Sequence, residues 1–208
     1  MTTPTKSRLG TVRNALASPA VYVVFQRAVW GRAMRALVTD HIRAEPGQRL
    51  LDMGCGPADI LRLMPTVDYV GFDHDEPYIT AARRRFGDRG EFRLAAVDSV
   101  PPFEPGAYDI VLAKGLLHHI SDAECRRLFD LAHSALVPGG RLITVDGCFH
   151  DRQKRAHRKI TSMDRGEFIR TPEEYERLAG ARFPHTKVTT HDDLLRIPYS
   201  LAIGEFTR

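Results

Sequence analysis

Residues 49–63 read RLLDMGCGPADILRL, and this stretch decides the fold. Two glycines, Gly54 and Gly56, separate an apolar run that ends at Asp52 from a second apolar run that begins at Ile60. Glycines two residues apart let the backbone turn sharply and leave no side chain between the turn and a ligand. The pattern predicts a strand, a tight turn and a helix whose first N–H groups are free. A small ligand is therefore expected against the turn.

The residues around the two glycines indicate what kind of ligand this is. A dinucleotide fingerprint places its third glycine five residues after the first, but here that position is Asp59, whose carboxylate would repel a pyrophosphate. Asp52, at the predicted carboxyl end of the strand, instead suits a ligand that carries positive charge. LDMGCGPAD resembles the first motif of class I S-adenosylmethionine-dependent methyltransferases, with Ala58 where that family often has a third small residue. The family's cofactor has an amino group and a sulfonium but no phosphate.

Acidic residues also follow the next two predicted strands. Residues 67–72 (VDYVGF) read as a second strand that ends in Asp73. In nucleoside-binding sheets a carboxylate at this point accepts hydrogen bonds from the two adjacent ribose hydroxyls, so Asp73 is expected to bind the ribose. Residues 92–97 read as a third strand that ends in Asp98 and Ser99, where the resemblance implies that the adenine amino group is held.

The fourth predicted strand, residues 107–113 (AYDIVLA), strengthens the resemblance. YDIVLAKGLLHHI is very close to the family's fourth motif, and LVPGGRLITVD, which contains a predicted fifth strand at residues 141–145, also matches the family. The resemblance implies an enzyme that binds S-adenosylmethionine and releases S-adenosylhomocysteine. The residues expected to bind the cofactor are Asp52, Gly54, Cys55, Gly56, Asp73, His74, Asp98, Ser99 and Lys114.

The alternation of strands with helices predicts a parallel sheet with right-handed crossovers. The expected fold class is α/β: a Rossmann-like, seven-stranded, mostly parallel sheet with a reversed last strand, helices on both faces and an N-terminal helix cap. One class I methyltransferase domain is expected over residues 1–208, with the cap in residues 1–45 and a substrate lid in residues 147–170. The predicted helices cover residues 77–86, 122–136 and 173–179, and two closing strands, 186–190 and 197–206, are expected to pair antiparallel.

Composition bounds the class of protein. The 208 residues suffice for one domain with a sizeable core, and the balance of 43% hydrophobic and 27% charged residues is typical of globular proteins. No apolar run is long enough to cross a membrane, and the first residues lack the apolar stretch of a secretory signal. Three cysteines without metal-type spacing imply no disulfides, so a cytoplasmic location is expected. A net charge of +4 permits an anionic substrate or nucleic acid without requiring either.

An N-terminal helix is predicted because apolar residues recur three or four apart between residues 22 and 37. Its apolar face is expected to pack on the edge of the sheet. The resemblance adds a second interpretation, since the family commonly places such a helix over the cofactor. The residues expected to cover the substrate are then Tyr22, Phe25 and Trp30.

Methyl transfer is a displacement at an activated carbon, so the protein mainly has to align the nucleophile, methyl group and sulfur and exclude water. A general base is needed only for a hydroxyl or a protonated amine. The candidates are His118 and His119 after the fourth strand, and Asp146 and His150 after the fifth. The alternatives are a shared packing or cofactor role for the histidine pair and loop capping for the other two. No metal site is expected, because residues 113–114 (AK) replace the metal-binding Asp of catechol-type enzymes.

The most individual segment, residues 147–166, is basic and lies between the fifth strand and the next helix. Its position suits a lid over the substrate, and its charge would select an anionic substrate such as a carboxylate, a phosphate or an acidic glycan. A helix with a solvated basic face would have the same composition. The basic residues are Arg152, Lys154, Arg155, Arg158 and Lys159.

The leading functional interpretation is an S-adenosylmethionine-dependent methyltransferase that acts on an oxygen or nitrogen atom of a small molecule. An RNA or tRNA methyltransferase is the second, although the Asn/Asp-Pro-Pro-aromatic sequence of base amino-methylating enzymes is absent after the fourth strand. The third is a catalytically idle subunit that binds the cofactor. A small molecule is the expected partner, nucleic acid is not favoured, and the protein is expected to be a monomer or homodimer.

Overall fold

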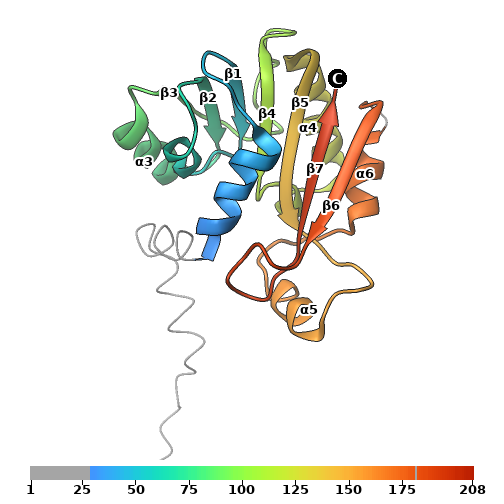
Figure 1. The fold of residues 1–208 in the computed structure, drawn as a ribbon. Coiled ribbons are helices and arrows are strands. Elements are labelled where there is room, and N and C mark those ends of the chain that lie inside the picture. Colours follow the sequence, from blue (N-terminus) through green and yellow to red (C-terminus); the bar gives the residue numbers. More distant parts are fainter. Residues whose placement is uncertain (1–28, 181) are drawn as a thin grey trace, which may run out of the picture.

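The computed structural model describes residues 29–180 and 182–208, and its centre is a seven-stranded sheet (Figure 1). The strands are β1 (Arg49–Met53), β2 (Asp68–Asp73), β3 (Gly90–Leu94), β4 (Tyr108–Lys114), β5 (Leu136–Gly147), β6 (His185–His191) and β7 (Leu201–Thr207). The N-terminal helix, of which the structure describes residues 29–36, leads into η1 (Leu37–Ile42). The other helical elements are η2 (Asp59–Arg62), α3 (Glu76–Phe86), η3 (Leu117–His119), α4 (Asp122–Ala135), α5 (Arg155–Thr161) and α6 (Pro172–Gly180).

The strand order is β3-β2-β1-β4-β5-β7-β6. The neighbours from β3 to β5 pair in parallel, whereas β7 is antiparallel to both β5 and β6. The Rossmann-like sheet with a reversed last strand is therefore confirmed. Because β1 lies between β2 and β4, the strand order reverses there, and ligands of such sheets bind outside the carboxyl ends at that point.

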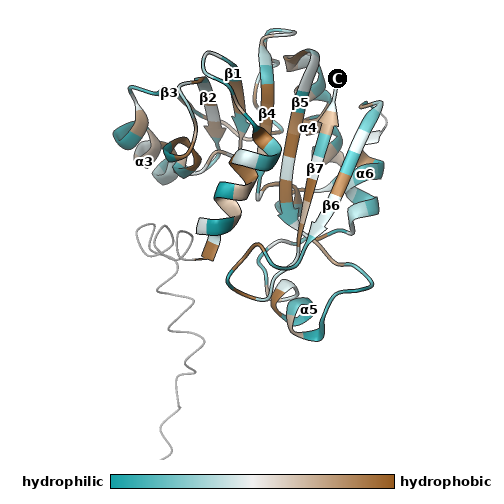
Figure 2. Ribbon diagram, viewed as in Figure 1, coloured by the Kyte–Doolittle hydropathy of each residue, from teal (hydrophilic) through white to brown (hydrophobic). Residues whose placement is uncertain are grey.

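Helices cover both faces of the sheet, as expected. On one face α4 and α6 pack against the strands, and on the other lie α3 and the N-terminal helix. Val29, Ala33 and Leu37 share one core with Leu50 and Ile110 of the central strands, so this helix covers the face of the sheet and not its edge (Figure 1). Figure 2 shows apolar residues concentrated in the central strands β4 and β5.

The element after the glycine turn differs from the prediction. Only one 3-10 turn, η2, forms there, because Ala58 adopts a left-handed conformation (φ 54°) and Pro65 follows soon after. The helix expected after the turn is therefore corrected to a short 3-10 helix. Instead, Asp59 forms ion pairs with Arg62 and Arg85, so its charge is neutralised within the protein.

Three predicted strand boundaries are also corrected. β3 ends at Leu94, so Asp98 and Ser99 lie in a turn beyond the strand and not at its end. β5 begins at Leu136, since Tyr108 pairs with Leu136 and Ile110 with Arg141 around a bulge. β7 begins only at Leu201.

The predicted helix starts are confirmed by their caps. Ser121 and Glu124 form a reciprocal capping box at α4, and Thr171 and Glu174 exchange the same hydrogen bonds at α6. Over the described residues, none of the helices has the length and apolar character needed to span a membrane.

Candidate active site

The glycine turn is fixed to the neighbouring strand β2. The Gly54 and Cys55 N–H groups both donate to the Phe72 carbonyl, at 2.8 and 2.9 Å, and the Gly56 N–H donates to Asp73 Oδ2 at 2.8 Å. Gly54 and Gly56 have φ of 74° and 54°, which L side chains rarely adopt. The turn is therefore a rigid strip of bare backbone beside the end of β2.

Asp73 is held so that its carboxylate stays at the end of β2. Its Oδ1 accepts from the Asp75 N–H at 2.9 Å, and its side chain is nearly buried. Exposed His74 lies beside it, with Nδ1 3.4 Å from Oδ1. Each carboxylate oxygen has a second lone pair, so Asp73 can still accept from the adjacent hydroxyls of a ribose.

Asp52 lies behind the turn, where it is 2% exposed. The Tyr69 hydroxyl donates to Oδ2 at 2.7 Å. Burial raises the pKa of Asp52 to about 6, although the hydrogen bond from Tyr69 and the charge of Lys114 oppose the rise. Lys114 Nζ also lies 5.2 Å from the centre of the partly buried Trp30 ring, which links the end of β4 to the N-terminal helix.

Other residues expected at the cofactor or substrate are less tightly placed. Asp98 and Ser99 are both exposed, and the Ser99 hydroxyl donates to the nearby Ala96 carbonyl. Tyr22 and Phe25 lie outside the described residues.

His118, in η3 after β4, and Asp146, near the end of β5, form a buried dyad. His118 Nδ1 lies 2.7 Å from Asp146 Oδ1, which also accepts from the His118 backbone N–H at 3.2 Å. Asp146 is 2% exposed, and its Oδ2 has no hydrogen-bond partner among the described residues. A buried carboxylate at Nδ1 fixes the orientation of the ring and leaves Nε2 to face the site.

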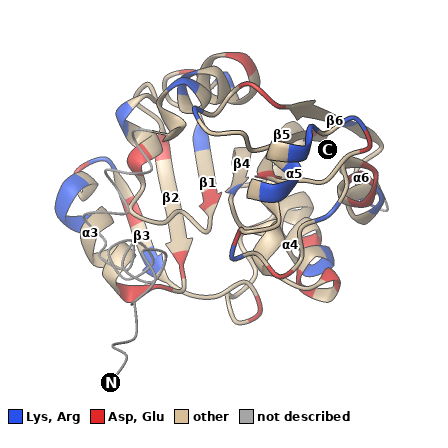
Figure 3. Cartoon of the chain, turned by 90° about the horizontal axis from the view of Figure 1, so that it is seen from below, with Lys and Arg blue, Asp and Glu red and all other residues tan. Residues whose placement is uncertain are grey.

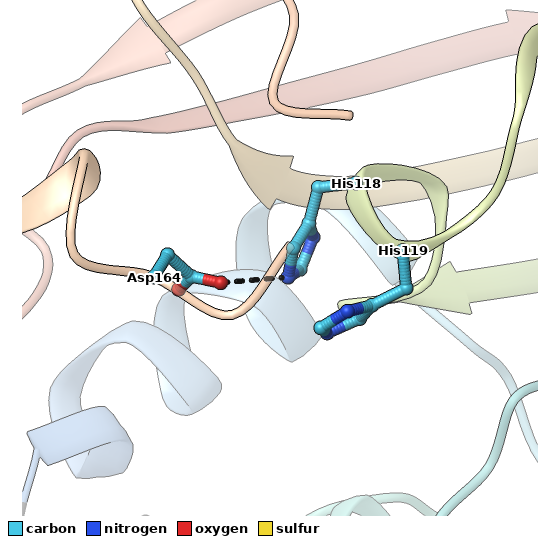
Figure 4. A group of neighbouring side chains, drawn as sticks. All are labelled: His118, His119 and Asp164. Atoms are coloured by element: carbon cyan, nitrogen blue, oxygen red, sulfur yellow. Dashed lines mark ion pairs between the residues drawn. The ribbon is translucent and has the colours of Figure 1, made fainter. Parts of the chain in front are cut away.

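A third carboxylate, from Asp164 after α5, faces this nitrogen (Figure 4). Its Oδ1 lies 3.5 Å from His118 Nε2, while the Tyr199 hydroxyl donates to its Oδ2 at 2.9 Å. The ring centre of His119, which is exposed, lies 4.1 Å from that of His118. Donor atoms of His118, His119 and Asp164 lie within 4.8 Å of one another, close enough to bind one cation.

The two histidines have opposite pKa shifts. Burial alone would lower the pKa of His118, but the hydrogen bond and charge of Asp146 and the charge of Asp164 outweigh it, and the pKa rises. Burial, reinforced by the charge of His118, lowers the pKa of His119. His118 is therefore the member of the pair that holds a proton more readily.

The segment after α5 is fastened to the loop that carries His118. The Phe168 N–H donates to the His118 carbonyl at 3.0 Å, and the buried Arg170 guanidinium donates to the Leu117 and Ile120 carbonyls and to Asp122. A Cβ on Gly166 would lie 2.3 Å from His118 Cδ2, so only glycine fits there. The predicted lid residues therefore contact the candidate base directly.

His150 is not part of this group. Its Nε2 lies 3.1 Å from Asp192 Oδ1, which also accepts from the Ser200 hydroxyl and lies 3.7 Å from His157 Nδ1. This cluster joins the lid to the loop before β7, so the geometry assigns His150 a role in holding the lid.

Basic residues gather on and around α5, beyond the carboxyl ends of the parallel strands (Figures 1 and 3). Residues 151–165 contain six basic and two acidic residues, a balance of +4 that equals the net charge of the whole chain. The basic side chains are exposed. An anion that approaches this edge therefore meets a positive field.

Sequence reasoning did not single out three polar residues of this site: Tyr69, Asp164 and Tyr199. Asp164 carried a weak signal, as the only acidic residue between residues 152 and 166. The tyrosines carried none, because their hydroxyls reach carboxylates 17 and 35 residues away.

Comparisons with known proteins show what this chain is similar to. Residues 50–140 match the family model of a methyltransferase domain. A human protein named "Probable tRNA methyltransferase 9B" is 30% identical over 64% of this chain and 28% of its own length. An uncharacterized 37.1 kDa protein in transposon TN4556 of Streptomyces fradiae is 31% identical over 54% of this chain and 34% of its own. The chain thus spans about a third of the length of these curated relatives.

Solved structures share the fold. Human N-acetylserotonin methyltransferase in complex with S-adenosylmethionine matches with a TM-score of 0.70 at 17% identity, over 98% of this chain and 60% of that one. The sheet and the bare turn at its switch point define an α/β protein of the methyltransferase type. Residues 50–140 thus match a methyltransferase domain, and the fold is the one found in solved S-adenosylmethionine-dependent methyltransferases.

Proposed function

We propose that this protein transfers the methyl group of S-adenosylmethionine to an oxygen or nitrogen atom of a small, anionic molecule, and that His118 accepts the proton of that atom. The observation that carries the proposal is the His118–Asp146 dyad at the same edge of the sheet as the glycine turn and Asp73. The family's cofactor would lie against the turn with its ribose on Asp73, and the dyad would meet the acceptor.

Methyl transfer requires few chemical steps from the protein itself. The sulfonium already activates the methyl carbon, so the protein has to hold the acceptor in line and remove its proton. Asp146 orients His118 and stabilises the imidazolium that forms. The lid, fastened through Phe168 and Arg170, would exclude water, and its basic residues would attract the anionic part of the acceptor.

The test is methylation of a cell extract by the purified protein with labelled S-adenosylmethionine. Label is expected in small molecules, and H118A is expected to slow its transfer by about 10²- to 10⁴-fold, the usual contribution of a general base. H118A should keep the wild-type affinity for S-adenosylhomocysteine, which shows that it is folded. His185→Ala, an exposed histidine at the start of β6, is the matched control and should behave as wild type.

Methylation of tRNA is the second candidate, favoured by the relative named for that activity and by the basic lid. Label that ribonuclease releases would establish it in place of the small-molecule reaction. A wild-type protein that binds S-adenosylhomocysteine but labels nothing would instead be a catalytically idle subunit.

A further inference from the structure

Where the methyl acceptor would bind, His118 and Asp164 each present an atom that accepts hydrogen bonds. Asp146 Oδ1 lies 2.7 Å from His118 Nδ1, so the neutral imidazole carries its proton on Nδ1 and donates it to that carboxylate. A neutral His118, which proton acceptance requires, then has a lone pair on Nε2. Asp164 Oδ1 lies 3.5 Å from this nitrogen (Figure 4). Both atoms accept hydrogen bonds, so a molecule bound between them has to supply the N–H or O–H donors.

Asp164 cannot turn away from this point. The Tyr199 hydroxyl donates to its Oδ2 at 2.9 Å and the Gly166 N–H to its Oδ1 at 2.8 Å. Gly166 itself is pressed against the His118 ring, where a Cβ would come within 2.3 Å of Cδ2. The carboxylate is therefore a fixed negative charge beside the candidate base.

We infer that the methyl acceptor is an amine nitrogen, bound between His118 Nε2 and Asp164. This inference rests on the proposed function and decides between its oxygen and nitrogen alternatives. A protonated amine has three N–H groups, enough to donate to both acceptors at once. A hydroxyl has one. After giving it to His118, the oxygen would carry a negative charge beside the Asp164 carboxylate, and like charges at this separation repel.

The reaction balances for an amine. The ammonium R–NH3⁺ gives one proton to His118 Nε2 and keeps an N–H donated to Asp164. The neutral amine then turns about that hydrogen bond so that its lone pair points at the methyl carbon. The new C–N bond forms as the C–S bond breaks, and the sulfur keeps the electron pair of that bond. The products are the methylated ammonium, S-adenosylhomocysteine and an imidazolium held between Asp146 and Asp164.

A divalent cation is the competing occupant, because His118, His119 and Asp164 offer ligand atoms within 4.8 Å of one another. A cation bound there would occupy Nε2 and would hold an acceptor oxygen in place of an amine. The two occupants therefore predict opposite products and opposite responses to a chelator.

The experiment uses S-adenosylmethionine labelled with ¹³C in its methyl group, a small-molecule cell extract and the full-length protein, with and without EDTA. Carbon–proton NMR of the products distinguishes N-methyl from O-methyl groups even while the substrate is unidentified. We expect N-methyl products, unaffected by EDTA. D164N should lower the rate by about 10- to 100-fold, the cost of a misplaced reactant, at unchanged affinity for S-adenosylhomocysteine.

Glu167→Gln removes an exposed carboxylate from the same loop and should leave the rate unchanged. O-methyl products, loss of methylation in EDTA, or a D164N rate equal to wild type would each overturn the inference while leaving methyl transfer intact. A wild-type protein that binds S-adenosylhomocysteine but methylates nothing would remove the proposed function itself, and the inference with it.

Discussion

At the scale of single residues, the three carboxylates of this site differ in the groups that hold them in place. Asp73 is held by two backbone N–H groups, Asp146 is buried on His118, and Asp164 is held by a tyrosine and a glycine N–H. Each carboxylate is fixed by donors from a different segment, so each keeps its position when a ligand arrives. Only Asp73 and Asp146 follow directly from their places at the ends of strands.

The electrostatics of His118 can be measured without a substrate. Asp146 and Asp164 face its ring and raise its pKa above the ordinary 6.5 despite burial and the opposing charge of Lys114, while His119 lies beside it. We therefore expect the NMR signal of the His118 ring, assigned by its absence in H118A, to titrate above 6.5. Activity that needs neutral His118 should rise as pH increases through that value.

D164N removes one of the charges that raise this pKa, so its midpoint should fall below that of the wild type. E167Q should not move it. A wild-type midpoint at or below 6.5, or one that D164N leaves unchanged, would contradict this arrangement of charges.

At the scale of elements, the loop after β4 and the lid form one unit through Arg170. Its guanidinium donates to the Leu117, Ile120 and Phe168 carbonyls and to Asp122, although its side chain is only 7% exposed. The Leu117 and Ile120 carbonyls flank His118 in the loop after β4, whereas the Phe168 carbonyl belongs to the segment after α5. Arg170 therefore supports the position of the base from a distance.

Arg170→Ala would remove the guanidinium donors from the Leu117 and Ile120 carbonyls and would break the ion pair with Asp122. We expect the free energy of unfolding to fall by about 2–4 kcal/mol in urea denaturation. Arg177→Ala, on the exposed side of α6, is the matched control and should change it by less than about 0.5 kcal/mol. Equal stabilities of the two variants would show that the guanidinium does not tie the lid to the loop.

The elements also show how far the sequence predicts the structure. The alternation of strands with helices and the starts of α4 and α6 follow from local periodicity, and the mostly parallel sheet with a reversed last strand was expected from the family resemblance. The structure confirmed these expectations. The helix after the turn and the end of β3 were wrong, because a left-handed Ala58 and a turn after Leu94 override the apolar pattern. Asp164 meets His118 only through the path of the lid, which no local pattern encodes.

At the scale of the whole molecule, charge and topology both indicate that a ligand binds at the edge formed by the carboxyl ends of the parallel strands. The parallel strands end there, the order reverses at β1, and residues 151–165 bring a balance of charge equal to that of the entire chain. The rest of the chain is balanced between acidic and basic residues. In the proposed function, the cofactor would lie at this edge on β1 and β2 and the methyl acceptor beneath residues 147–170.

The central claim is that the glycine turn and Asp73 bind the nucleoside of S-adenosylmethionine, and calorimetric titration of S-adenosylhomocysteine tests it most directly. We expect saturable binding by the wild type, about 100-fold weaker binding by Asp73→Ala because two hydrogen bonds to a carboxylate are lost, and no heat with NAD. Asp68→Ala, exposed at the opposite end of the same strand, should bind as wild type. A folded wild-type protein that does not bind S-adenosylhomocysteine, or an Asp73→Ala variant that binds it unchanged, would contradict the account.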